Sequence, residues 1–219
     1  MKPVASARLL LATLLALTTA PVLAASQCAA VVGEGWPPAV ANYGDAAAQL
    51  LGGVTEEGLS LLSLPARGPE SQVQLRREPG QAGQWVVVAG LADKRIYSWN
   101  SGSSRAGVNL RLDQQPELAQ APVPDALAQR LLQVWAAALA SSEVAPRAPV
   151  TDGEVVSFTL NGARYSGLRP GCGRLEALLD QAALLVELAH SKDKKHEKRY
   201  ADIERALDKM HDRFSGDAG

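Results

Sequence analysis

The spacing of apolar residues divides the chain into helical segments and short strands. Apolar side chains recur at helical spacing over residues 39–51, 124–140 and 173–190, which predicts three amphipathic helices. Between the first two segments, apolar and polar residues alternate with period two in short runs, a pattern typical of strands. The predicted strands lie at residues 59–64, 72–76, 85–89, 96–99 and 108–112. Five short strands at this spacing favour an antiparallel meander.

A further strand pair is predicted before the third helix. Apolar and polar residues alternate over residues 156–160, and a second strand returns over 165–168. Asn161-Gly162 predicts a two-residue hairpin turn, because a type I′ turn needs positive φ at both positions. Residues 26–36 and the proline-bearing stretch 113–124 are expected to be irregular. We therefore predict an α+β fold, with an antiparallel sheet of five to seven strands and helices packed on one face.

The C-terminal segment, residues 191–219, is dense in charges of both signs and is predicted to be an amphipathic helix with a short tail. Its apolar residues occur at spacings of 3, 4, 3 and 4 and form a narrow seam. The seam residues are Tyr200, Ile203, Leu207, Met210 and Phe214. Two interpretations stay open. The seam docks on the chain's own domain, or it binds another envelope protein or a second copy of the chain.

Residues 1–25 have the three-part layout of a secretory signal peptide. Lys2 and Arg8 accompany an apolar run, Leu9–Leu17, and cleavage is expected after Ala24 or Ala25. The run is shorter than the roughly 20 residues that cross a bilayer, so we expect no membrane span in the mature chain. The expected location is the periplasm or the extracellular space, with a single domain over residues 26–190.

The expected export changes the charge of the mature chain and the chemistry expected of its cysteines. The chain has 22 Lys and Arg against 23 Asp and Glu, and without Lys2 and Arg8 the counts are 20 and 23, a formal charge of −3. This balance does not favour nucleic acid as a partner. Cys28 and Cys172 are the only two cysteines, and an exported protein favours a disulfide between them.

The sequence offers no recognised catalytic or cofactor motif. It contains no HExxH, GxSxG, GxGxxG or phosphate-binding loop. Asp208, His211 and Asp212 lie within one helical turn, but two or three exposed ligands rarely form a closed metal site. We therefore predict no catalytic residue, no metal and no cofactor.

Aromatic residues beside a Ser/Gly loop are candidates for recognition. Tyr97 and Trp99 precede the loop of residues 100–107. Loops on a rigid scaffold often carry binding residues, so this rim is a candidate site for a sugar or a peptide.

Two resemblances bear on function. The run from Asp152-Gly153-Glu154 through the tyrosine hairpin to the leucine-rich helix 175–189 resembles the C-terminal half of uncharacterised exported bacterial proteins, over about residues 70–189, and brings no catalytic residue. The stretch Gly162-Ala163-Arg164-Tyr165-Ser166 is similar to the SGxxY loop of periplasmic inhibitors of C-type lysozyme, with Asn161 in place of the serine. In that family the loop plugs the target's active site, which implies a binding role for Arg164 and Tyr165.

Together these features favour a non-enzymatic binding or inhibitor-like protein whose partner is another protein. Two alternatives remain. The first is an envelope enzyme whose site carries no known motif, which a deep pocket of convergent polar groups would support. The second is a carrier of a small apolar ligand, which a cavity of about 300 Å³ or more between sheet and helices would support.

Overall fold

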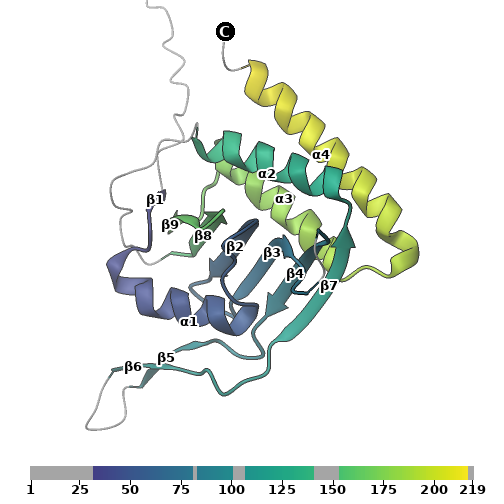
Figure 1. Cartoon of the computed structure of the whole chain (residues 1–219). Coiled ribbons are helices and arrows are strands. Elements are labelled where there is room, and N and C mark those ends of the chain that lie inside the picture. The colour runs from purple at the N-terminus through teal and green to yellow at the C-terminus, as the bar shows by residue number, and fades with distance from the viewer. Residues whose placement is uncertain (1–31, 81–82, 101–106, 141–152, 217–219) are drawn as a thin grey trace, which may run out of the picture.

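The computed structural model describes residues 32–80, 83–100, 107–140 and 153–216. Within them, seven strands form one antiparallel sheet in the order β1-β9-β8-β2-β3-β4-β7 (Figure 1). The strands are β1 (Val32–Glu34), β2 (Leu59–Leu64), β3 (Ser71–Arg77), β4 (Trp85–Leu91), β7 (Glu117–Val123), β8 (Val155–Leu160) and β9 (Ala163–Leu168). The helices are η1 (Pro38–Val40), α1 (Ala41–Leu51), α2 (Asp125–Ala140), α3 (Gly173–Ala189), η2 (Asp193–Lys195) and α4 (His196–Gly216). The predicted α+β class and antiparallel sheet are confirmed.

The main core lies between one face of the sheet and helices α2 and α3. Alternate residues of the central strands, such as Leu75, Val87 and Phe158, are buried on this face. Trp135 of α2 packs edge-on against Phe158, with ring centroids 6.0 Å apart. Leu178 is among the fully buried residues of α3 in the same cluster. The apolar residues that alternate along the strands therefore pack against the apolar stripes of α2 and α3, as the sequence predicts.

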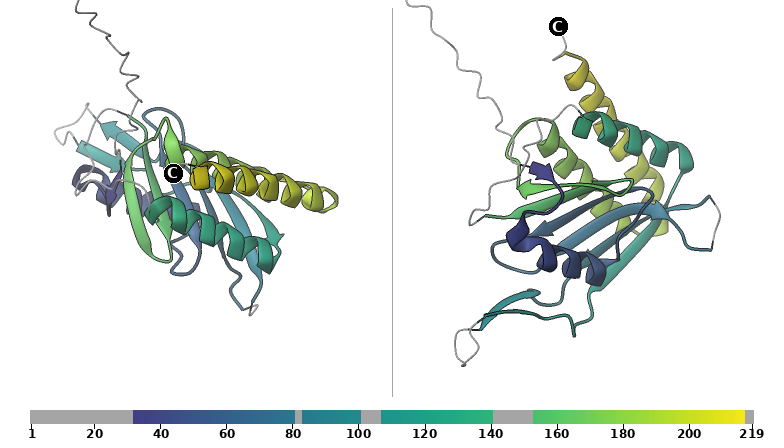
Figure 2. Two further views of the ribbon diagram at one scale, coloured as in Figure 1. Left: turned by 90° about the horizontal axis from the view of Figure 1, so that it is seen from above. Right: turned by 60° about the vertical axis from the view of Figure 1, so that its left-hand side comes forward.

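Helix α1 packs on the opposite face of the sheet, so the prediction that it shares one face with α2 and α3 was wrong (Figures 1 and 2). Its buried side chains, including Tyr43 and Leu51, join a second cluster with Leu62. Gln72 and Gln74 point to this face, and both donate a side-chain hydrogen bond to the Gly53 carbonyl. Both glutamines are buried, because the segment after α1 supplies their hydrogen-bond partner and the helix covers them.

Two segments expected to be irregular are edge strands. β1 pairs with β9 within the predicted lead-in, and β7 pairs with β4 within the predicted connection. Proline lacks a backbone donor and is tolerated on an edge strand. Pro122 sits in β7, which has only β4 beside it, and its carbonyl accepts a hydrogen bond from the Tyr200 hydroxyl at 2.8 Å. The proline therefore marked a sheet edge and not a loop.

The predicted five-strand meander is interrupted. β2, β3 and β4 follow one another in the sheet, but β5 (Tyr97–Asn100) and β6 (Gly107–Leu110) form a separate two-stranded hairpin. We call these eight residues the arm. The arm lies beside α1, away from α2, α3 and α4, and extends past the sheet (Figures 1 and 2).

Helix α4 packs against α3 and α2 (Figure 2). Ile203 and Leu207 of its seam are fully buried in the main core, and Met210 is nearly so. Among the described residues, no helix combines the length and the apolar character needed to cross a membrane. The predicted signal peptide and most of the Ser/Gly loop lie outside the described residues.

Candidate functional site

The arm is an amphipathic hairpin. Tyr97 lies opposite Leu110, and Trp99 lies opposite Val108, so these four apolar side chains share one face. Ser98 and its partner on β6 occupy the other face. The apolar face therefore has an inner pair near the domain and an outer pair farther along the hairpin.

The inner pair is packed and the outer pair is not. Tyr97 and Leu110 pack against the α1-side cluster, and the Tyr97 ring lies 5.2 Å from that of Tyr43. Trp99 is 60% exposed and Val108 is 52% exposed. A contiguous exposed apolar surface that includes an indole is typical of an interaction site. The outer pair of the arm is therefore the candidate functional site.

A buried carboxylate holds the base of the arm. Glu70 is fully buried, and its two side-chain oxygens accept hydrogen bonds from three donors. The donors are the Tyr43 hydroxyl, the Ile96 amide at 2.7 Å and the Tyr97 amide at 3.3 Å. Glu70 directly precedes β3, and its hydrogen-bond partners lie in α1 and at the start of the arm. One side chain therefore joins the sheet, α1 and the arm. Buried polar groups with complete partners fix local structure, which keeps the arm in one orientation.

Arg95 packs on the same part of the arm. The Arg95 guanidinium carbon lies 5.4 Å from the Tyr97 ring centroid. Burial, and then the hydrogen bond to Glu70, raises the pKa of the Tyr43 hydroxyl far above its ordinary value. Tyr43 therefore stays protonated and keeps donating to Glu70 over the whole physiological range. The cluster is structural, because Glu70 has no solvent-exposed surface from which to meet a substrate.

A wide, open hollow of about 850 Å³ lies beside the arm. It is lined by Asp93, Lys94 and the segment 109–115. Asn109 of the arm's polar face contributes to it. Trp99 and Val108 do not line the hollow, which lies on the polar side of the arm and is separate from the outer pair.

Arg164 and Tyr165, the residues of the lysozyme-inhibitor resemblance, do not form a projecting loop. The turn has the predicted positive φ at Asn161 (47°) and Gly162 (82°), but the Asn161 side chain accepts a hydrogen bond from the Gly58 amide. Arg164 forms an ion pair with Asp45 at 2.8 Å. Tyr165 packs against the main core. Both candidate residues therefore have intramolecular partners.

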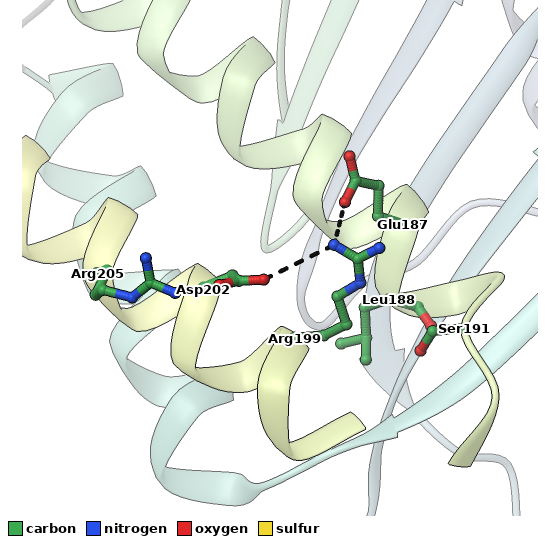
Figure 3. Close-up of polar contacts among 6 residues, drawn as sticks. All are labelled: Glu187, Leu188, Ser191, Arg199, Asp202 and Arg205. Carbon is green, nitrogen blue, oxygen red and sulfur yellow. Dashed lines mark hydrogen bonds and ion pairs between the residues drawn. The ribbon is translucent and has the colours of Figure 1, made fainter. Parts of the chain in front are cut away.

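The C-terminal seam is occupied by the chain itself, which agrees with the first of its two interpretations. Ile203, Leu207 and Met210 are buried against the main core, so they are not a free surface. At the α3–α4 contact, Arg199 lies between Glu187 of α3 and Asp202 of its own helix (Figure 3). Tyr200 is half-buried, and its hydroxyl donates a hydrogen bond to the Pro122 carbonyl. The side chain of Phe214 lies outside the described residues.

Cys172 occupies the N-cap position of α3. Its predicted partner, Cys28, lies outside the described residues, so their disulfide stays a prediction. No group of three or more metal-ligating side chains comes together in the described ranges.

The comparisons with known proteins add no family to this picture. No protein-family model matches the chain, and neither curated proteins nor solved structures yield a similar protein. The evidence for a function is therefore the geometry and chemistry of the chain's own sites. Among the predicted binding residues whose side chains the structure describes, Trp99 alone is largely exposed, and its cross-strand neighbour Val108 was not predicted as a binding residue. The alternation of Val108, Leu110 and Leu112 was visible, but the pairing register with Trp99 was not.

Proposed function

We propose that this protein is a non-enzymatic binding protein of the periplasm or the extracellular space, which captures a partner protein through the outer pair of its arm. The observation that carries the proposal is the exposed Trp99–Val108 pair on a hairpin whose base is fixed by Glu70. A tryptophan held rigidly at the centre of an interface commonly contributes much of the binding free energy.

The arm is a better candidate than the C-terminal seam. The seam is apolar, but its central residues are already buried, and freeing them would expose the core. The outer pair of the arm can be covered by a partner without any change in the domain. The expected partner surface is an apolar pocket that accepts the Trp99 indole. The expected mature charge of −3 disfavours an anionic membrane as the alternative surface.

The proposal is tested by quantitative affinity capture from cells that produce the protein. Purified wild type is compared with Trp99→Ser/Val108→Ser as bait, and partners are identified by mass spectrometry. Loss of a central tryptophan costs about 2 kcal/mol or more of binding, which is roughly a thirtyfold weaker complex. We expect one protein to be enriched by the wild type and lost by the double variant.

A matched control separates the arm from exposed apolar residues in general. Val54 and Leu118 are 57% and 55% exposed and lie outside the arm, so Val54→Ser/Leu118→Ser removes comparable surface. This control bait should retain the partner. If both double variants lose it equally, or neither does, the arm is not the binding site.

A further inference from the structure

A groove runs along the C-terminal half of α3, at the margin of its contact with the strands beneath it. It has a volume of about 400 Å³, within the range of small-molecule sites. Its walls are largely apolar. The apolar lining includes Leu61, Val73, Ala89, Leu179, Ala182 and Val186. This location, between sheet and helix, is where an apolar ligand could be held without displacing the core.

Small residues on both walls explain why the groove is open. The strand register aligns Ser63, Ser71 and Leu91 in one row at its edge. On α3, Ala182 and Ala183 face the groove, where longer side chains would close it. Leu91 and Val186 are 41% and 36% exposed, so the groove presents apolar surface to water. Exposed apolar surface in a concave site is a common mark of ligand binding.

The two ends of the groove differ in charge. At the β8–β9 end, Glu154 accepts hydrogen bonds from Ser63 at 2.5 Å and from Arg169 at 3.0 Å. At the other end lies His190, directly after α3. The Glu154 carboxylate is therefore already paired with a positive charge and hydrogen-bonded. The His190 end, in contrast, adjoins a group of basic residues.

His190 also lines a second hollow, of about 450 Å³, at the turn between α3 and α4. Lys192, Lys194, Lys195 and Arg199 line it, with Glu187 as the single acidic residue. Arg199 is paired with Glu187, as Figure 3 shows. No carboxylate of the described residues forms an ion pair with the three lysines. A chain with more acidic than basic residues thus concentrates unpaired positive charge beside this end of the groove.

We propose that the groove binds a free fatty acid, with its acyl chain along Leu61, Val73 and Val186 and its carboxylate at the His190 end. Charge complementarity selects this ligand: the apolar walls take the chain, and the adjacent lysines attract the anionic head. The site is separate from the arm, so it does not depend on the proposed protein partner.

The test is calorimetric titration of the full chain with dodecanoate below its micelle concentration, beside dodecyltrimethylammonium and monododecanoyl glycerol. We expect one dodecanoate per chain, bound at least tenfold more tightly than the cationic probe. The variant Ala183→Trp fills the groove from an exposed position and should weaken dodecanoate binding at least tenfold. The control Ala136→Trp makes the same change on an exposed position of α2 and should bind as the wild type does.

The head-group assignment has its own variant, Lys192→Glu/Lys194→Glu/Lys195→Glu. It should weaken dodecanoate binding about tenfold and leave the neutral glyceride unchanged. If Ala183→Trp unfolds the protein, Leu91→Gln at the groove edge takes its place. The proposal is overturned if dodecanoate does not bind, or if all three probes bind equally. It is also overturned if the chain self-associates, binds no dodecanoate, and becomes monomeric in the Ala183→Trp variant.

Discussion

The role of Glu70 gives the sharpest stability prediction, because one fully buried carboxylate holds the sheet, α1 and the arm together. Glu70→Ala removes the acceptor for the Tyr43 hydroxyl and the Ile96 amide, both of which stay buried. An unsatisfied buried donor costs about 1–3 kcal/mol, so two cost about 4 kcal/mol, partly offset because a desolvated charge is also removed. We expect a net loss of about 3 kcal/mol in the free energy of unfolding.

The isosteric variant separates hydrogen bonding from packing. Glu70→Gln keeps the volume and one acceptor oxygen, so we expect it to lose only about 1 kcal/mol. Glu57→Ala changes an exposed carboxylate and should have an effect within about 0.5 kcal/mol. Urea unfolding followed by circular dichroism measures all three variants against the wild type.

Amide hydrogen exchange adds the local readout. Because Glu70 binds the amides of Ile96 and Tyr97, the alanine variant should exchange these amides faster, while amides of α3 change little. Glu70→Ala could instead unfold at the same urea concentration as the wild type and protect the Ile96 and Tyr97 amides as well as the wild type does. That result would show that the carboxylate does not hold the arm.

Three further predictions concern other parts of the fold. Leu207→Ala should cost about 3 kcal/mol in urea unfolding, since Leu207 is fully buried, whereas the exposed Lys209→Ala should cost almost nothing; equal effects would mean that α4 is not part of the core. Because the pKa of Tyr43 is raised in the folded state, its contribution to the free energy of unfolding is complete below pH 10, the ordinary tyrosine value, and falls as pH rises above it. Tyr43→Phe should therefore reduce the loss of unfolding free energy at alkaline pH. An unchanged pH profile of stability would contradict this. Non-reducing peptide mapping of mature protein should recover a peptide joining Cys172 to Cys28, and two free thiols would exclude the disulfide.

The sequence predicted most of the main core because its periodic signals agree with its packing. Residues such as Val87 and Phe158 alternate with period two, and Trp135 lies on the apolar stripe of its helix. The Asn161-Gly162 turn was predictable because few residue pairs accept positive φ twice in succession.

The errors have a common physical origin in long-range partners. Polar Gln72 and Gln74 in β3 do not reveal that α1 covers their face, because the acceptor of their hydrogen bonds, the Gly53 carbonyl, is distant in sequence. Pro122 indicates a loop unless its strand is known to lie at the sheet edge. The exposure of Trp99 could not be read from the sequence either, because its neighbour Tyr97 on the same face is packed against α1.

Site-specific photo-crosslinking on the arm tests the proposed function most directly. A photoreactive phenylalanine analogue at position 108 replaces an exposed residue of the outer pair, and the same analogue at position 54 serves as the control. The proposed function predicts one covalent adduct from position 108, absent from position 54, which excess wild-type protein suppresses and excess Trp99→Ser does not. No adduct from position 108, or equal suppression by both competitors, would contradict a partner-binding role for the arm.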